Sequence, residues 1–260
     1  MSRYTHIRTD RRDEVIEVTL DRPPLNAIDG ELHRDLGRLA ADLKNETEAR
    51  AVVLTGAGRA FSAGGDYEWF TQLDDPDVRE EVRRVGRQLV WDLLDVEVPI
   101  VAAVNGPAVG LGATLVLLCD AVFMADDAVI ADPHVRVGIV AGDGGTALWP
   151  LALGPVAAKR FLLTGDPVTA EEARTLGLAT HVSSADRVLD EAREFARRLA
   201  SLPPLAVRYT KLAVNKWIKQ AANVAFDVAT AYELVTFASE DHREALRALR
   251  EKRPPRFEGR

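Results

Sequence analysis

The chain has 260 residues, of which 47% are hydrophobic and 28% charged, and its 33 Lys and Arg against 40 Asp and Glu give a net charge of −7. Such a composition predicts a soluble globular protein of one large domain, or of one domain with a small appendage, and excludes a disordered chain. The acidic balance argues against nucleic acid or a membrane surface as a partner, because both need clustered Lys and Arg. The single cysteine, Cys119, cannot form an internal disulfide, and no secretory signal is visible, so we expect a cytoplasmic protein.

Strands and helices are predicted to alternate over about the first 180 residues. Short β-branched runs predict strands, and apolar residues three or four positions apart predict helices. The predicted strands cover residues 15–20, 51–55, 99–104 and 121–125, and the predicted helices cover residues 32–43, 78–94 and 110–118. Asp29 is a candidate N-cap of the first helix. This alternation predicts an α/β fold with largely parallel strands.

From residue 186 onward the pattern is helical throughout. Apolar stripes predict helices over residues 188–199, 205–218, 222–237 and 241–253. Ahead of this region, Thr169 and Glu172 have the spacing of a capping box. The chain is therefore predicted to consist of an α/β core, residues 1–190, and a C-terminal helical subdomain, residues 191–260.

Two glycine-containing segments that follow predicted strands can present free backbone N–H groups. Residues 59–66 (Arg-Ala-Phe-Ser-Ala-Gly-Gly-Asp) form a turn of small residues, where the backbone can approach a ligand closely. Residues 105–112 (Asn-Gly-Pro-Ala-Val-Gly-Leu-Gly) end a strand and open an apolar helix, whose first N–H groups have no partner within the helix. Together, two such donors can stabilise an oxyanion.

A third segment, residues 131–146, places His134 and Asp143 on either side of a short apolar stretch. An imidazole titrates near neutral pH and a carboxylate can fix its tautomer, so this pair is a candidate for acid–base chemistry. A lone histidine is more often structural, and an aspartate between two glycines is also a common turn residue. No two of the five histidines have the spacing of metal ligands, so we expect no bound metal.

In chain order, several short motifs resemble those of the crotonase (enoyl-CoA hydratase/isomerase) superfamily, and they cover nearly the whole sequence. The motifs are Leu20-Asp-Arg-Pro, Asn26-Ala, Ala60-Phe-Ser-Ala-Gly64, Ala102-Ala-Val-Asn-Gly106, Cys119-Asp120, Gly142-x-Gly-Gly-Thr146, Leu162-Leu-Thr-Gly165 and Glu251-Lys-Arg-x-Pro-x-Phe257. The resemblance implies a crotonase-type spiral of ββα units and a C-terminal helical part used in trimerisation, as a homotrimer or a dimer of trimers. It also implies an acyl-CoA substrate and no prosthetic group, coenzyme A being present only as part of the substrate.

The resemblance also implies which residues form the site. The family holds a thioester enolate with two backbone N–H groups, which correspond here to Gly65 and Leu111, and each donor can contribute roughly 3–4 kcal/mol in the transition state. Lys252 matches a lysine that contacts coenzyme A. The last eighteen residues carry a net charge of +4 and the rest of the chain −11, so the phosphates are expected at this basic tail. The other positions implied to lie near the substrate are Ala63, Phe61, Asp66, Arg22, Thr114 and Trp69.

The sequence departs from the family's hydratases at the two glutamates that perform hydration. One corresponds to Thr114 here, and the other follows the proline that here precedes His134. Hydration of an enoyl thioester needs groups that activate water and deliver a proton, and a threonine hydroxyl has no useful pKa near neutrality. The two-glutamate mechanism therefore cannot be transferred to this chain.

The segment with Pro133-His134, Gly142-Asp143-Gly144 and Trp149-Pro150 resembles crotonase-fold β-diketone hydrolases of the 6-oxocamphor hydrolase type. Those enzymes cleave a C–C bond by a retro-Claisen route, and the resemblance implies that His134 activates water while Asp143 orients it. A second histidine of those hydrolases corresponds to Leu111 here, which leaves only a backbone contact to the oxyanion.

Three functions remain open at this point. The first expectation is an enzyme that acts on an acyl-CoA thioester through an enolate, with His134 and Asp143 performing hydration, dehydration or hydrolytic C–C cleavage. One alternative is a β-diketone hydrolase that does not need coenzyme A. The other is a catalytically idle acyl-CoA-binding protein, because both family glutamates are missing.

Overall fold

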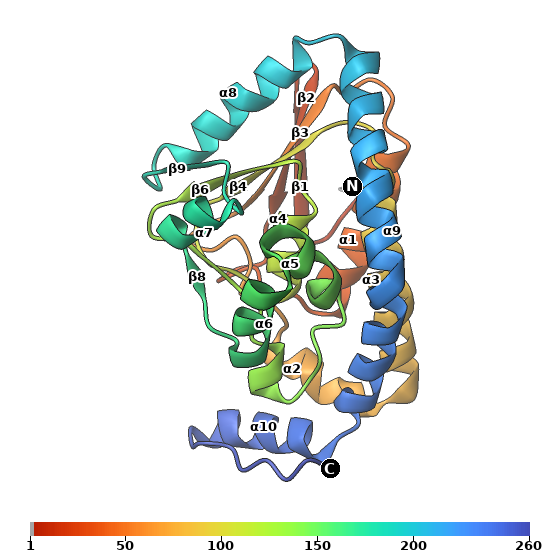
Figure 1. Ribbon diagram of the computed structural model, residues 1–260, viewed down its shortest axis with the longest axis vertical. Helices are drawn as coiled ribbons and strands as arrows, with labels where there is room; N and C mark the ends of the chain where they lie inside the picture. The colour runs from red at the N-terminus through yellow and green to blue at the C-terminus, as the bar shows by residue number, and fades with distance from the viewer. Residues whose placement is uncertain (1–2) are drawn as a thin grey trace.

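The computed structural model describes residues 3–260 and centres on a six-stranded sheet (Figure 1). Its strands, in spatial order, are β1 (Ile7–Arg12), β2 (Val15–Leu20), β3 (Ala51–Gly56), β4 (Ile100–Val104), β6 (Ala121–Ala125) and β9 (His181–Ser183). Neighbouring strands run parallel except β1, which pairs antiparallel with β2. The four predicted strands and their parallel pairing are confirmed, whereas β1 and β9 were not predicted.

A second, three-stranded sheet contains the short strands. They are β5 (Ala108–Val109), β7 (Val129–Ala131) and β8 (Val168–Thr169). Because β5 follows β4 and β7 follows β6, successive stretches of chain give one strand to each sheet. Isolated bridges from Ser62 to Ala108 and from Ile28 to Gly65 extend this pattern. The strand–strand–helix units therefore repeat along the chain, as the spiral predicts.

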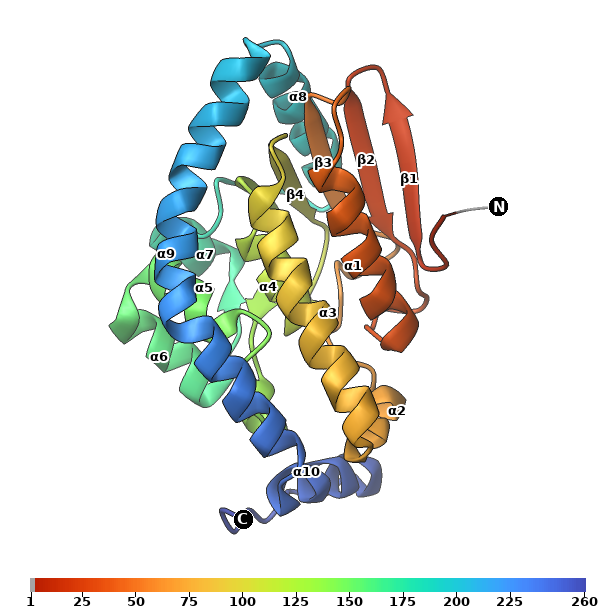
Figure 2. The same ribbon diagram turned by 90° about the vertical axis from the view of Figure 1, so that its right-hand side faces the viewer.

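The helices pack around the two sheets (Figures 1 and 2). They are α1 (Gly30–Lys44), α2 (Tyr67–Phe70), α3 (Pro76–Asp95), α4 (Leu111–Leu117), α5 (Gly145–Leu153), α6 (Pro155–Thr164), α7 (Ala170–Leu176), α8 (Val188–Ala200), α9 (Pro204–Phe237) and α10 (Glu240–Glu251), with the 3₁₀ helices η1 (Thr71–Asp74) and η2 (His134–Val137). At the predicted N-cap, the Asp29 carboxylate accepts a hydrogen bond from the Leu32 N–H at 2.8 Å. The predicted capping box of Thr169 and Glu172 begins α7.

The central strands form a rigid base for the loops that follow them. β3, β4 and β6 are buried along their whole length, as expected for parallel strands that are covered on both faces. Helix α8 packs on these three strands, and its buried side chains are small: Val188, Ala192, Ala196 and Ala200. Helices α1 and α3 lie side by side (Figure 2).

The prediction of two separate helices at residues 205–218 and 222–237 was wrong. Residues 204–237 form one 34-residue helix, α9. The residues predicted to separate the two helices, Lys-Gln-Ala at 219–221, include no glycine or proline that would end a helix. The polar residues at 219 and 220 interrupt the apolar pattern but not the helical backbone.

Helix α9 runs antiparallel to α3, because Lys219 contacts Asp95 whereas Asp227 contacts Arg87. Its first half is held to the sheet region by the buried Lys211, whose Nζ donates to the Val98 carbonyl oxygen at 2.9 Å. These contacts fix the distance between α3 and α9 and so define the walls of the space between them.

Part of α9 presents an apolar face to solvent. Its side chains that are more than half exposed include Trp217, Val224, Val228, Tyr232 and Val235. Such a face agrees with the predicted trimer, which stays a prediction. The predicted boundary after residue 190 falls inside α8. Within residues 3–260, no helix is both long and apolar enough to cross a membrane.

Candidate active site

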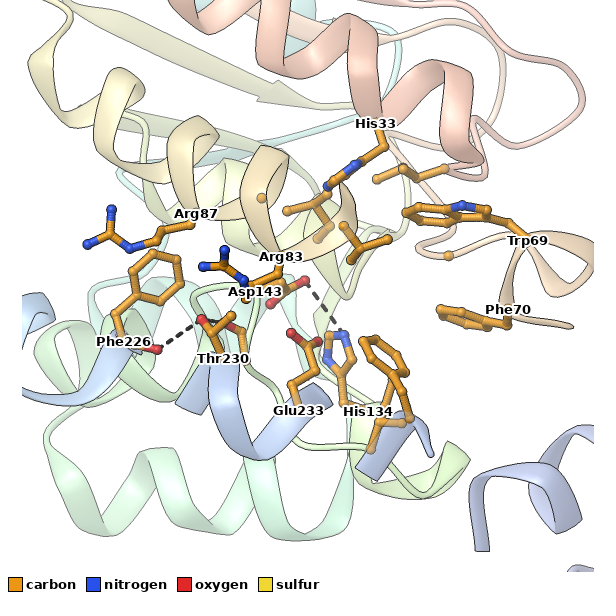
Figure 3. Close-up of a pocket in the computed structure, with 18 residues that line it drawn as sticks. His33, Trp69, Phe70, Arg83, Arg87, His134, Asp143, Phe226, Thr230 and Glu233 are labelled. Atoms are coloured by element: carbon orange, nitrogen blue, oxygen red, sulfur yellow. Dashed lines mark hydrogen bonds and ion pairs between the residues drawn. The ribbon is translucent and has the colours of Figure 1, made fainter. Parts of the chain in front are cut away.

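The three predicted site segments meet at one cavity, which lies between α3 and α9 (Figure 3). The Ser62–Ala108 bridge joins the loop after β3 to the loop after β4, and the Gly110 N–H donates to the Ala131 carbonyl oxygen at 2.9 Å, which joins the second segment to the third. As a result, the predicted residues Gly65, Leu111, His134 and Asp143 all line the cavity.

Gly65 and Leu111 line the cavity with unpaired backbone donors. Across residues 3–260, no hydrogen-bond acceptor is found for either N–H group. Gly64 and Gly110, which precede them, have φ angles of 82° and 55°, a region that favours glycine because it has no Cβ. Leu111 is also the first residue of α4, where an N–H has no partner within the helix. This geometry suits an oxyanion-binding pair, a role that stays a prediction.

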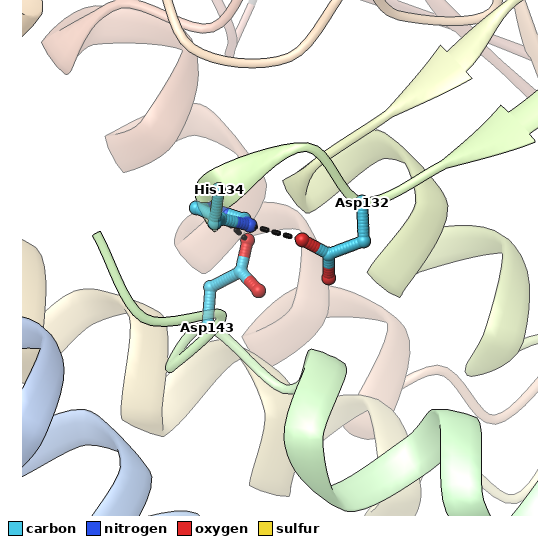
Figure 4. Close-up of side chains that lie close together, drawn as sticks. All are labelled: Asp132, His134 and Asp143. Carbon is cyan, nitrogen blue, oxygen red and sulfur yellow. Dashed lines mark hydrogen bonds and ion pairs between the residues drawn. The ribbon is translucent and has the colours of Figure 1, made fainter. Parts of the chain in front are cut away.

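His134 lies between two carboxylates (Figure 4). Its Nδ1 contacts Oδ1 of Asp132, and its Nε2 lies 3.6 Å from Oδ2 of Asp143. The other oxygen of Asp143 accepts a hydrogen bond from the Thr114 hydroxyl at 3.2 Å, which holds this carboxylate in place. A separation of 3.6 Å is too long for a direct hydrogen bond, so Nε2 and this oxygen both remain able to contact a molecule in the cavity.

Three buried carboxyl groups control the charge of the His134 ring. Burial alone would lower the pKa of His134, but the carboxylates of Asp132 and Asp143 outweigh it and raise that pKa to about 10. Burial raises the pKa of Asp143, and burial together with the charge of Asp143 raises the pKa of Glu233 well above its ordinary range. The four groups therefore hold and exchange protons as one coupled cluster.

Asp132 was not singled out in the sequence, although it lies only two residues before His134. Its side chain is fully buried, and its Oδ2 has no hydrogen-bond partner among residues 3–260. The neighbouring backbone is close, since a Cβ added to Gly145 would lie 2.2 Å from this oxygen. Only a glycine at position 145 leaves room for the carboxylate that holds His134.

A metal centre would need several ligand atoms close together, and those of Asp132, His134 and Asp143 lie within 4.8 Å of one another. The two carboxylates contact different nitrogens of the imidazole, however. These nitrogens point in divergent directions, so one ion cannot use the ring and both carboxylates together. The arrangement fits a histidine oriented by carboxylates better than it fits a metal site.

Glu233 and His33 are two titratable residues among the cavity-wall positions that were missed in the sequence. Glu233 lies on the buried face of α9, seven residues after Phe226 and four before Phe237. An acidic residue at the helical spacing of these buried aromatic residues was the signal in the sequence that could have identified it. His33 lies on the buried face of α1, and burial lowers its pKa to about 4. His33 is therefore neutral near pH 7, and its ring lies 5.2 Å from that of Trp69, centroid to centroid.

The predicted substrate-binding residues lie in different places. Trp69 lines the cavity, as predicted. Thr114 is fully buried and reaches the site only through its hydrogen bond to Asp143. Phe61 is fully buried in the hydrophobic core and does not line the cavity, because its side chain points into the packed interior below the loop.

Ala63, Asp66 and Arg22 also lie outside the cavity wall. The Ala63 N–H donates to a backbone carbonyl, and Asp66 caps α2. Arg22 pairs with Asp29 at 2.8 Å and with Asp66 at 2.9 Å, so its guanidinium is already engaged within the chain. Lys252 follows α10 and is exposed.

Helix α10 is clamped onto the turn that contains His134. The buried ring of His242 hydrogen-bonds through Nδ1 to the carbonyl oxygen of Val137 at 2.7 Å, and Val137 ends the 3₁₀ helix that His134 begins. The ring also packs edge-on against Phe70 and Phe237, two residues of the cavity wall. Burial lowers the pKa of His242, so the ring is neutral near pH 7 and Nδ1 can donate.

Replacing His242 by alanine leaves the Val137 carbonyl without its donor and opens a gap under the His134 turn. We expect His242→Ala to lower the free energy of unfolding by about 1–3 kcal/mol, measured by urea unfolding. His181, whose side chain is half exposed, provides a matched control, and His181→Ala should change stability by less than about 0.5 kcal/mol. Equal effects of the two substitutions would contradict the clamp.

Gly86 is a buried glycine in the middle of α3 and lines the cavity. A Cβ at this position would lie 3.5 Å from Nε2 of His33, an ordinary contact. Because alanine is favoured over glycine inside a helix by about 1 kcal/mol, we expect Gly86→Ala to raise Tm by about 2–4 °C and to raise KM by narrowing the cavity. Calorimetry and steady-state kinetics test this, and a lower Tm would show that the methyl group is not accommodated.

The strand–strand–helix spiral and its acid–base cavity define the class of protein, an α/β fold of the crotonase type. A family model described as enoyl-CoA hydratase/isomerase matches residues 10–260, and the chain belongs to this family.

Individual relatives support the same conclusion. A carnitinyl-CoA dehydratase from Proteus mirabilis is 34% identical, with 100% of each chain covered. An enoyl-CoA hydratase/isomerase from Mycobacterium paratuberculosis superposes with a TM-score of 0.91 at 43% identity, covering 94% of this chain and 98% of that chain. A β-diketone hydrolase from the cyanobacterium Anabaena, solved with (S)-3-oxocyclohexyl acetic acid, superposes with a TM-score of 0.85 at 32% identity, covering 90% and 95%.

Proposed function

We propose that this protein hydrolyses one of the two C–C bonds that join the central carbon of a 1,3-dicarbonyl compound to its carbonyl carbons, by a retro-Claisen route. The observation that carries the proposal is the His134 ring, held between Asp132 and Asp143 beside the same cavity that Gly65 and Leu111 line. The His134 ring between its two carboxylates suits the activation of water, and the N–H groups of Gly65 and Leu111 suit the stabilisation of an enolate.

In the proposed reaction, the neutral form of His134, whose population rises as pH approaches the raised pKa of about 10, takes a proton from water as the water oxygen attacks one carbonyl carbon. The bond from that carbon to the central carbon breaks, and its electron pair forms an enolate on the second carbonyl. The enolate oxygen accepts hydrogen bonds from the N–H groups of Gly65 and Leu111. A proton then returns to the central carbon, so that one water is consumed and a carboxylic acid and a ketone are formed.

The carboxyl groups have separate roles in this scheme. Asp132 fixes the tautomer of His134 and stabilises its imidazolium form. Asp143 orients the attacking water, since its Oδ2 lies beside Nε2 of His134 at the cavity wall. Burial raises the pKa of Glu233, which favours its protonated form, and we assign Glu233 as the acid that gives a proton to the central carbon and regains it from His134.

The cluster favours catalysis over the idle-binder alternative. Burying three carboxyl groups around one imidazole costs folding free energy, and such strongly shifted groups gather mainly where chemistry uses them. A protein that only bound acyl-CoA would gain nothing from this arrangement.

The first proposed substrate is a small β-diketone without coenzyme A. Arg22, a predicted substrate-binding residue, is already paired with Asp29 and Asp66, and the structurally similar Anabaena protein is a β-diketone hydrolase. The second candidate is hydration, dehydration or C–C cleavage of an acyl-CoA thioester, favoured by family membership and by the carnitinyl-CoA dehydratase relative. Coenzyme A would then be part of the substrate, and in neither case is a prosthetic group proposed.

A substrate panel separates these candidates. The purified protein is incubated with a cyclic 1,3-diketone, a 3-oxoacyl-CoA and crotonyl-CoA, and products are identified by mass spectrometry. We expect the diketone to open to a keto acid with the added mass of one water. Conversion of crotonyl-CoA alone would show that the protein is a hydratase and not a hydrolase. Tight binding of coenzyme A esters without any product would favour the catalytically idle binding protein.

A further inference from the structure

The α3 side of the cavity is basic. Arg83 and Arg87 lie about one turn apart on α3, and both line the cavity (Figure 3). Their side chains are 37% and 39% exposed, so each spans from the cavity wall to solvent. Neither residue belongs to the acid–base cluster around His134, so the proposed reaction leaves both unexplained.

The antiparallel course of α3 and α9 places these arginines along the cavity. Val82 of α3 packs in one apolar cluster with Phe237 of α9, whereas Arg87 pairs with Asp227, nearly three turns earlier on α9. Glu233, the member of the acid–base cluster on α9, lies between these two levels. Arg87 therefore lies toward the end of the cavity opposite the apolar cluster, and Arg83, which directly follows Val82, lies nearer to that cluster.

Both guanidinium groups have spare hydrogen-bonding capacity. Arg83 pairs with Glu80 on its own helix, and Arg87 pairs with Asp227 at 2.8 Å; both of these carboxylates are more than half exposed. Exposed pairs of this kind contribute little net free energy. Among residues 3–260, each guanidinium uses two of its five N–H donors. A further carboxylate can therefore bind both arginines without displacing a strong partner.

The charges along the cavity would also orient an anionic molecule. The carboxyl groups of Asp132, Asp143 and Glu233 at the reacting end disfavour a second negative charge there. Arg83 and Arg87 attract it, and guanidinium groups bind carboxylates with charge-assisted hydrogen bonds. A substrate with a carboxylate at one end would enter with its carbonyl groups toward His134.

We propose that Arg83 and Arg87 bind a carboxylate of the substrate on the α3 side of the cavity. The inference rests on the proposed function and narrows its substrate class to acidic 1,3-dicarbonyl compounds, such as a cyclic β-diketone with a carboxymethyl substituent.

Binding is tested with two inert probes of the same shape, cyclohexylacetate and cyclohexylacetamide, by titration calorimetry. We expect the carboxylate to bind about tenfold tighter or more to the wild-type protein, and Arg83→Met to remove this preference. Arg84→Met is the matched control, because Arg84 is exposed on the same helix and does not line the cavity. Equal affinity of the wild-type protein for both probes would overturn the proposal.

Arg87 also joins α3 to α9, so a second variant tests its role with both arginines in place. Asp227→Asn removes the carboxylate that competes for Arg87. We expect this variant to bind cyclohexylacetate about threefold tighter or more, with the affinity for cyclohexylacetamide unchanged. A purely structural Arg87 would give no gain for the carboxylate, which would contradict the proposal.

Turnover separates this inference from the proposed function. The substrates are a carboxymethyl-substituted cyclic 1,3-diketone and its carboxamide. We expect the wild-type protein to prefer the acid and Arg83→Met to lose this preference. Equal turnover of both by the wild-type protein would overturn the carboxylate site and leave the hydrolase function standing. Selective binding of cyclohexylacetate with no turnover of either diketone would overturn the function and leave the site standing.

Discussion

Replacing His134 by alanine should lower kcat/KM for a 1,3-diketone by about 10³-fold or more, with the diketone still bound. The imidazole is the proposed base that takes the proton of water. Once the ring is removed, Asp132 and Asp143 no longer have a base to orient. Steady-state kinetics give the loss, and circular dichroism with titration calorimetry shows that fold and binding are retained.

His181 is the matched control for this substitution. Its side chain is half exposed on β9, where it pairs with Glu191 outside the cavity wall. We expect His181→Ala to keep kcat/KM within about twofold of the wild-type value. Turnover of His134→Ala close to that of the control would refute the role assigned to His134.

Asp132→Asn should have the second-largest effect and should also move the pH profile. Asparagine cannot stabilise the imidazolium form or enforce the same tautomer of His134, so we expect the maximal kcat/KM to fall by about 10²- to 10⁴-fold. Burial lowers the pKa of His134 and the neighbouring carboxylates raise it to about 10. Removing the charge of Asp132 therefore lowers this pKa. Since the neutral ring is the base, the acidic limb of the profile should shift to lower pH.

The shift is measured by recording kcat/KM from roughly pH 5 to pH 11 for both proteins. Asp127, an exposed residue in the turn after β6, provides the control variant Asp127→Asn, which should leave both the maximum and the limb unchanged. An unshifted limb together with an undiminished maximum in Asp132→Asn would show that this carboxylate does not act on the catalytic imidazole.

Sequence patterns predicted the framework because its causes are local. The buried strands at residues 51–56 and 100–104 are continuous apolar runs, and the first helix begins at an aspartate that caps it. His134 and Asp143 were also recognisable, since both occur in one short segment that ends in a glycine-rich turn. The cavity that both residues line agrees with this prediction.

The rest of the site depends on contacts between segments far apart in the chain. Glu233 meets Asp143 only because α9 runs back along α3, and its helical spacing resembles that of a packing residue. His33 on α1 reaches the same cavity across the fold. Phe61, in contrast, belongs to a motif next to the site, yet its side chain enters the core. Spacing in the sequence does not tell on which side of a loop a residue lies.

The most direct test of water attack on a carbonyl carbon in this cavity is a single-turnover reaction of a cyclic 1,3-diketone in ¹⁸O-labelled water. We expect one labelled oxygen in the carboxyl group of the keto acid, formed by the wild-type protein and lost with His134→Ala. Formation of an unlabelled carboxyl group, or equal labelled product from His134→Ala, would contradict hydrolysis through His134.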